Sequence, residues 1–202
     1  MMENMANRQS TADKTRRMVG MAIFSAIIIV LQLIATFVKI GSFSITLVLI
    51  PIVVGAAVYG PRSGAWFGGV FAFIVLLGCI FGWDVGGNIL WNANPFLTLL
   101  ICFIKGIAAG YAAGIVYTAI AKKNQYIGVI VAAIVCPVVN TGLFCVAMAL
   151  FFHDILVAWA AGKELLYYTI IGLVGINFLI ELAINVVLCP TVARIIRIGN
   201  KI

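Results

Sequence analysis

Long stretches without a single charged residue constrain this chain more than any other feature of its sequence. Residues 18–38 and 126–152 contain no Asp, Glu, Lys or Arg. About 20 apolar residues in a helix cross the hydrocarbon core of a bilayer. A water-soluble fold of 202 residues cannot bury so much apolar surface, because 64% of the residues are hydrophobic and only 9% are charged. The chain is therefore predicted to be an integral membrane protein, and soluble enzymes are excluded.

The apolar runs predict an all-α fold with six transmembrane helices in one compact bundle. They are far longer than the about 11 residues of a barrel strand, and they do not alternate in polarity. The predicted spans are residues 18–38, 43–59, 65–81, 95–121, 126–152 and 165–193. Residues 1–17 and 198–202 are predicted to be tails on either side of a membrane domain that covers residues 18–197.

Charge predicts how this bundle lies in the membrane. With the N-terminus inside, the cytoplasmic segments hold ten of the 13 basic residues, whereas the outer segments hold only Lys39 and Lys163. Cytoplasmic loops of membrane proteins carry an excess of Lys and Arg, so both termini are predicted to be cytoplasmic. The net charge of +7 is then explained by topology and by anionic lipids, and nucleic acid is not an expected partner.

Motifs for catalysis and for metal binding are missing from the sequence. Without a GxxxxGK[ST] motif the chain is not expected to hydrolyse ATP, and HExxH and GxSxG are also absent. The five cysteines all fall in apolar runs, none forms a CxxC pair, and His153 is the only histidine. We therefore expect reduced packing thiols, no metal, no cofactor and no enzymatic activity.

Small residues four positions apart let membrane helices approach closely. The glycines with this spacing are Gly64 and Gly68, and Gly106, Gly110 and Gly114. For the glycines we expect packing within the chain rather than a surface for a partner. Ala22 and Ala26 form a further small pair, and their spacing alone does not decide between these roles.

Two ionisable residues, Lys105 and Glu181, lie deep within the apolar runs. Because an unpaired charge there costs at least about 2.5 kcal/mol, each should face the bundle interior, a watery cavity or the other. Lys105 and Glu181 could form an ion pair that joins two helices, or they could contact a ligand, and the sequence is consistent with both roles. Asn177 and Asn185 share a helix face with Glu181, so this stripe could line a cavity or bridge helices.

Asn140 follows Pro137 by three residues within the fifth apolar run. A proline inside a helix leaves one backbone carbonyl without its usual donor. The Asn140 side chain could satisfy that carbonyl or contact a ligand, and both roles stay open.

The connection before Pro95 is rich in aromatic and amide side chains. Tryptophans often mark the membrane interface, but that preference does not explain the amides and the acid between them. Aromatic faces and converging amides suit a flat or polar small molecule in a mostly apolar pocket. The candidate ligand-binding residues here are Trp83, Asp84, Asn88, Trp91, Asn92 and Asn94.

Several short sequences occur together with the six predicted spans. They are Ala22-Ile-Phe-Ser-Ala26, Ser44-Ile-Thr-Leu-Val-Leu-Ile-Pro51, Tyr59-Gly-Pro-Arg-Ser-Gly64, Asn92-Ala-Asn-Pro95 and Pro137-Val-Val-Asn-Thr141. In this combination the chain resembles the substrate-binding S components of energy-coupling factor (ECF) transporters. The resemblance covers nearly the whole chain.

The resemblance implies a vitamin-capture subunit in a bacterial plasma membrane, working with a membrane T subunit and two ATPase subunits. It also implies that Ala22 and Ala26 contact the T subunit. Substrate would bind near the outer face, and Lys105 would supply a counter-charge for a carboxylate such as that of pantothenate. The substrate-binding residues implied are Ser42, Ser44, Trp83, Asp84, Trp91, Asn92, Asn94, Asn140 and Asn177, with Lys105 and Glu181 as further candidates.

Two other functions stay open. A self-sufficient carrier could couple transport to protons through Glu181, which predicts a pH-driven flux that Glu181→Gln abolishes. Alternatively, a structural or assembly protein of the membrane would bind no ligand, and Lys105 and Glu181 would simply pair.

Overall fold

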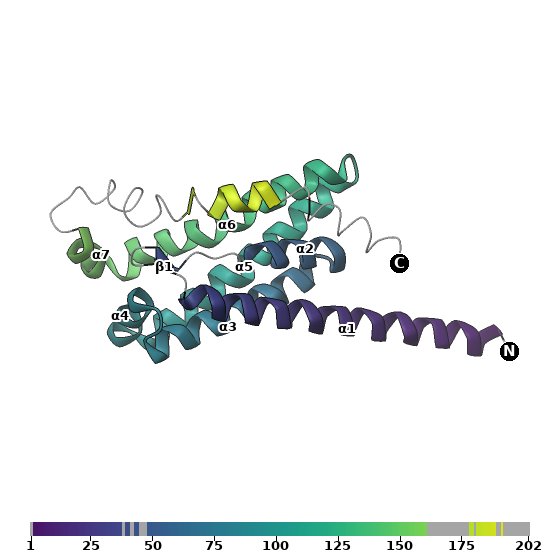
Figure 1. Cartoon of the computed structure of the whole chain (residues 1–202), viewed down its shortest axis with the longest axis horizontal. Coiled ribbons are helices and arrows are strands. Elements are labelled where there is room, and N and C mark those ends of the chain that lie inside the picture. The colour runs from purple at the N-terminus through teal and green to yellow at the C-terminus, as the bar shows by residue number, and fades with distance from the viewer. Residues whose placement is uncertain are drawn as a thin grey trace.

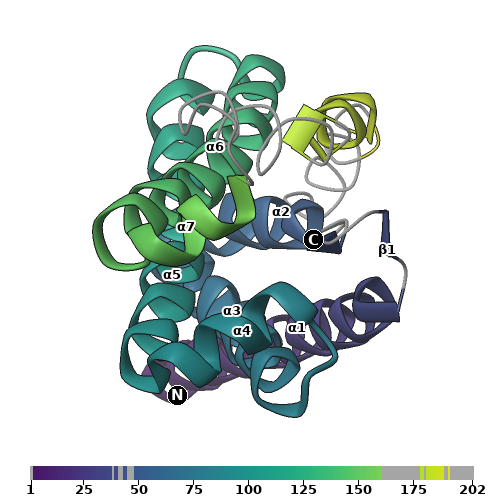
Figure 2. The same ribbon diagram turned by 90° about the vertical axis from the view of Figure 1, so that its left-hand side faces the viewer.

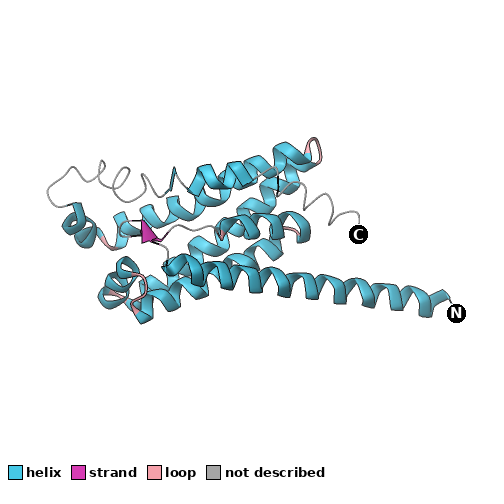
Figure 3. Ribbon diagram, viewed as in Figure 1, coloured by secondary structure: helices cyan, strands magenta, loops and turns pink. Residues whose placement is uncertain are grey.

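The fold is known from a computed structural model. It describes residues 2–37, 39–40, 43–44, 48–160, 178–179, 181–188 and 191. Side chains are described for residues 13–36, 48–160, 178–179, 181–188 and 191. Helices account for most of this part of the chain (Figure 3).

The helices follow one another with short connections (Figure 1). They are α1 (Met2–Phe37), α2 (Leu49–Tyr59), α3 (Pro61–Phe81), α4 (Val85–Ala93), α5 (Pro95–Ala121), α6 (Gln125–Phe151) and α7 (His153–Ala160). Residues 178–179 and 181–188 are also helical, and we call them the C-terminal helix. Two very short strands, β1 (Lys39–Ile40) and β2 (Phe43–Ser44), pair antiparallel between α1 and α2.

Within the described residues, four helices are long and apolar enough to cross a membrane: α1 from Asp13 to Thr36, α3, α5 and α6. The all-α class is therefore confirmed for this part of the chain, apart from the β1–β2 pair. The count of six spans and their orientation stay predictions, because most of residues 165–193 lies outside the described residues.

Several boundaries differ from the sequence prediction, and α1 already begins at Met2 instead of residue 18 and α3 at Pro61 instead of residue 65. The second helix does not start at residue 43, because Phe43 and Ser44 pair with β1 and α2 starts only at Leu49. The connections on either side of α5 and α6 are also not simple loops, since they contain α4 and α7. Both helices are too short for a span, and each buries one apolar face, with Leu90 in α4 and Leu156 in α7.

Local signals explain where the long helices begin. Asn94 Oδ1 accepts a hydrogen bond from Leu97 N at 3.1 Å, and Pro95 occupies the first turn of α5. Asn124 Oδ1 does the same for α6, at 2.9 Å from Tyr126 N. Between α2 and α3, Gly60 adopts a φ of 93°, a backbone conformation that side chains disfavour.

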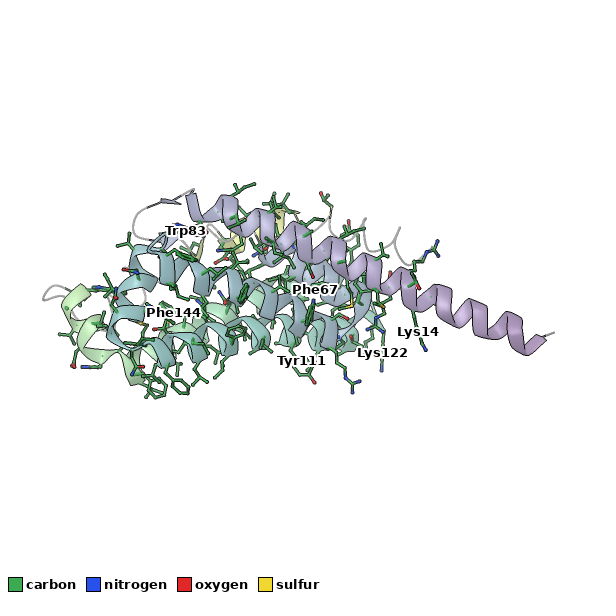
Figure 4. The ribbon with its side chains drawn as sticks, turned by 90° about the horizontal axis from the view of Figure 1, so that it is seen from below. Lys14, Phe67, Trp83, Tyr111, Lys122 and Phe144 are labelled. Atoms are coloured by element: carbon green, nitrogen blue, oxygen red, sulfur yellow. The ribbon has the colours of Figure 1, made fainter. Side chains whose placement is uncertain are left out.

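The short helix α2 lies at the centre of the bundle and packs against α1, α3, α5 and α6 (Figure 2). The core around it includes Ile28 of α1, Phe67 of α3 and Cys136 of α6. Phe67 is fully buried, and its ring centroid lies 5.9 Å from that of Phe24 and 6.5 Å from that of Tyr59 (Figure 4). The aromatic contacts therefore attach α1 to the centre of the bundle.

Glycines hold α3 and α5 in direct backbone contact. A Cβ placed on Gly106 would lie 2.6 Å from Gly68 O, a separation that real Cβ atoms essentially never show. In the same way, Gly64 lies against the Gly110 carbonyl and Gly114 lies against Pro61. The predicted packing of these glycines within the chain is confirmed, and we call this contact the glycine seam.

The basic residues of the described part gather at one end of the bundle, apart from Lys39 in β1 and Lys105 in α5. Lys14 and Lys122 lie at one end (Figure 4), which also holds the α2–α3 turn with Arg62; we call it the basic end. The opposite end holds β1, α4 and α7, with Asp84 and Asp154 (Figure 1). This separation is what the positive-inside pattern requires of a bundle with a cytoplasmic N-terminus.

Arg17 is expected to stabilise the basic end. Its Nη2 donates hydrogen bonds to Tyr59 O at 3.0 Å and to Ser63 Oγ at 3.2 Å, so it joins α1 to the last turn of α2. Arg17→Met should lower the Tm of the detergent-solubilised protein by about 2–4 °C. Lys14→Met, also at an exposed position of α1, is the control and should leave the Tm unchanged. An unchanged Tm for Arg17→Met would contradict this role.

Candidate substrate-binding site

The amides in and next to α4, at the end of the bundle opposite the basic end, form hydrogen bonds within the protein. Asn88 Nδ2 donates to Cys79 O at 2.8 Å, near the last turn of α3, and Asn92 Nδ2 donates to Asn88 Oδ1 at 3.0 Å. Asn94 caps α5, as described above. These side chains therefore tie together the end of α3, all of α4 and the start of α5. Their predicted contacts with substrate remain predictions.

The aromatic and acidic residues of this region lie at its surface. The exposed ring of Trp83 stacks on Phe81, with centroids 5.3 Å apart, whereas Asp84 and Trp91 are partly buried. Ser44 belongs to β2, where its side chain is not described. Ser42 and Asn177 lie outside the described residues.

Lys105 is partly buried between α5 and α6. Its Nζ lies 4.8 Å from the ring centroid of Phe144, a cation–π geometry. It also interacts electrostatically with Cys79 and Cys102, two buried thiols that share a hydrogen bond, and Asp84 interacts with the same thiols. The structure thus brings Lys105 and Asp84 into the same region, where α3, α4 and α5 meet.

Buried amides form a second group, deeper in the bundle. The side chains of Gln32, Asn140 and Asn185 are 6%, 8% and 2% exposed. Three of their atoms, Gln32 Oε1, Asn140 Oδ1 and Asn185 Nδ2, have no hydrogen-bond partner within the part of the chain that the structure describes. A buried polar atom left unpaired costs about 1–3 kcal/mol, so such atoms usually meet a water or a ligand.

The position of these amides follows from the helices that carry them. Gln32 comes four residues after Ile28, and Asn140 comes four residues after Cys136, so each lies one helical turn beyond the core toward the opposite end. Glu181, which is buried, interacts electrostatically with Cys136, and the C-terminal helix lies level with the middle of α6 (Figure 1). We call Gln32, Asn140, Glu181 and Asn185 the polar layer.

Comparison with known proteins identifies the family. A sequence model of the family described as "ECF transporter, substrate-specific component" matches residues 16–193. The chain belongs to this family. No curated protein and no solved structure matches it. The S component is accordingly a substrate-capture subunit of a membrane transporter, not an enzyme.

One residue of the polar layer was not predicted from the sequence of this S component. Gln32 is the one amide in an uncharged run, and Thr36 Oγ1 donates to its backbone carbonyl at 2.8 Å. Polar side chains within membrane spans are costly and often functional, so an amide in such a run is a usable signal. Asn140 and Glu181, which were predicted, lie in the same layer.

The S component also exposes a stripe of small and apolar residues along α1. The stripe consists of Met18, Ala22, Ala26, Val30 and Ile34, which recur every four residues and are all exposed. Phe24 and Ile28, on another face of the helix, pack into the bundle. We call the exposed face the alanine stripe. It faces lipid or a partner, because a membrane helix is covered by one or the other.

Proposed function

We propose that this S component captures a water-soluble vitamin or a related micronutrient from outside and delivers it through an ATP-driven importer in a bacterial plasma membrane. The observation that carries the proposal is the pair of buried oxygens, Gln32 Oε1 and Asn140 Oδ1, without a partner among the described residues. In a bundle whose surroundings are apolar, a small polar molecule would satisfy both. Membership of the ECF family supports the substrate as that molecule.

The proposed orientation has the basic end in the cytoplasm. The opposite end then faces outside, and substrate would pass Trp83, Asp84 and Trp91 before it reaches the polar layer. The proposal keeps Ser42, Ser44, Asn92, Asn94, Lys105, Asn177 and Glu181 as further contacts. Pantothenate is the first substrate to test.

Energy would come from partner subunits. The sequence contains no ATP-binding GxxxxGK[ST] motif, so hydrolysis requires separate ATPase subunits joined through a membrane T subunit. The exposure of Ala22 and Ala26 on the alanine stripe supports their assignment as the contact with the T subunit. Small residues there would let the two backbones approach closely.

A thermal-shift screen of the detergent-solubilised chain against water-soluble vitamins tests substrate capture. A ligand at 1,000 times its Kd should stabilise the protein by about 4 kcal/mol, since stabilisation grows as RT ln(1 + [L]/Kd). The cognate vitamin should therefore raise the Tm by several degrees. A flat response to every vitamin would contradict the proposal and favour a structural or assembly role.

Reconstitution into vesicles tests the division of labour. The purified chain alone should bind its substrate but should not concentrate it inside vesicles, with or without ATP. Uptake should begin only when the T and ATPase subunits are added. A pH-driven uptake by the chain alone that Glu181→Gln abolishes would instead identify a proton-coupled carrier.

A further inference from the structure

The polar layer offers hydrogen-bond acceptors from two different helices. Gln32 Oε1 comes from α1 and Asn140 Oδ1 comes from α6, and both lie one turn beyond the same apolar core. Each atom is an amide oxygen, which accepts hydrogen bonds and cannot donate them. An N–H or O–H group of a bound molecule is what these oxygens require.

A carboxylate does not meet this requirement. An ionised carboxylate only accepts hydrogen bonds, so it would pair with the NH2 groups of Gln32 and Asn140 and not with the two oxygens that the structure leaves unpaired. Glu181 lies in the same layer and brings a carboxyl group of its own.

Lys105 lies outside this layer. Its ammonium group sits over the Phe144 ring, and Phe144 follows Asn140 by four residues, one turn nearer the opposite end. Lys105 also interacts electrostatically with Cys79 of α3, Cys102 of α5 and Cys145 of α6. The ammonium group of Lys105 is therefore placed beside the Phe144 ring.

We infer that the polar layer recognises an uncharged, donor-bearing part of the substrate: a carboxamide, an amino-substituted ring or a hydroxyl group. Gln32 and Asn140 each accept a hydrogen bond from it. Asn185 Nδ2, the unpaired donor of the layer among the described residues, is available to a carbonyl or ring nitrogen of the same molecule. This inference rests on the proposed function and specifies the chemistry of its substrate.

Matched acid and neutral probes test this chemistry on the full-length, detergent-solubilised chain. Two pairs are used, nicotinate with nicotinamide and pantothenate with pantothenol, and binding is measured by thermal shift and by calorimetry. In each pair that binds, the neutral member should bind at least about ten-fold more tightly than the acid, the equivalent of one good hydrogen bond. Tighter binding of either acid would overturn the inference.

Two near-isosteric variants locate the contacts. Gln32→Met and Asn140→Leu should each weaken binding of the preferred neutral probe at least about ten-fold. Each should also raise the Tm of the ligand-free protein, because it removes a buried polar atom that has no partner among the described residues. Gln125→Met, at an exposed position of the basic end, is the matched control and should change neither quantity.

The outcomes separate this inference from the proposed function. If an acid binds more tightly and Lys105→Met abolishes that binding, the chain is a capture subunit with a different recognition chemistry, and only the inference fails. If Gln32→Met and Asn140→Leu lower the Tm of the ligand-free protein and leave binding unchanged, the amides are structural and the inference also fails. If no vitamin and no probe binds, both fail.

Discussion

Replacing Gly68 with leucine is expected to prevent the bundle from folding. A Cβ at this position would overlap the carbonyl oxygen of Gly106, and the obstacle is backbone rather than a side chain that can rotate. Overpacking a well-packed core typically costs about 1–3 kcal/mol, and here α3 and α5 would in addition have to separate along the whole glycine seam. Since typical proteins are stable by only about 5–15 kcal/mol, we expect loss of the folded state.

Expression level, monodispersity in size-exclusion chromatography and Tm measure this effect. The control is Gly142→Leu, because Gly142 is an exposed glycine of α6, and a Cβ there would meet no packing neighbour within 4 Å among the described residues. That variant should fold normally, and its Tm should not fall, since leucine is the better helix former. A monodisperse Gly68→Leu protein with wild-type Tm would show that the seam tolerates side chains and that the α3–α5 contact is not as close as described.

The second large effect is expected at the alanine stripe. Ala22→Trp and Ala26→Trp should each reduce ATP-driven uptake by the reconstituted complex at least about 100-fold, because an indole ring would keep the T subunit from close contact. Substrate binding by the isolated chain should be unchanged, since both alanines are exposed on the side of α1 that faces away from the core. Comparing uptake by the complex with the Kd of the isolated chain separates assembly from capture.

Ala149→Trp is the control for the alanine stripe. Ala149 is an exposed alanine on α6, so the substitution adds the same bulk to a membrane helix at another position. It should leave uptake close to the wild-type rate. Equal losses for Ala149→Trp and Ala26→Trp, or full uptake by Ala22→Trp and Ala26→Trp, would exclude the alanine stripe as the specific contact.

Features with a local cause were predictable from the sequence. Helix α5 begins at Pro95 and ends at Ala121 as predicted, because a proline marks its start and a Lys-Lys-Asn sequence follows its end. The glycine seam was predictable for the same kind of reason, since four-residue spacing puts glycines on one helix face. Asn140 and Glu181 were found because polar residues are conspicuous in apolar runs.

Features that depend on tertiary contacts were not predictable. Helices α4 and α7 are short, and each buries only a few residues against the bundle. Hydropathy alone therefore does not distinguish them from loops. An asparagine that caps a helix is also indistinguishable in sequence from one that binds a ligand. For that reason Asn94 was a candidate only for binding, whereas its side chain holds the first turn of α5.

The direct contact between α3 and α5 also limits how this protein can respond to its cargo. Gly64, Gly68, Gly106 and Gly110 bring peptide groups against peptide groups, so no rotamer change can let one helix slide past the other. We expect these two helices to move as one rigid body. We expect opening and closing to involve α1 and α7, which pack against the rest of the bundle through side chains.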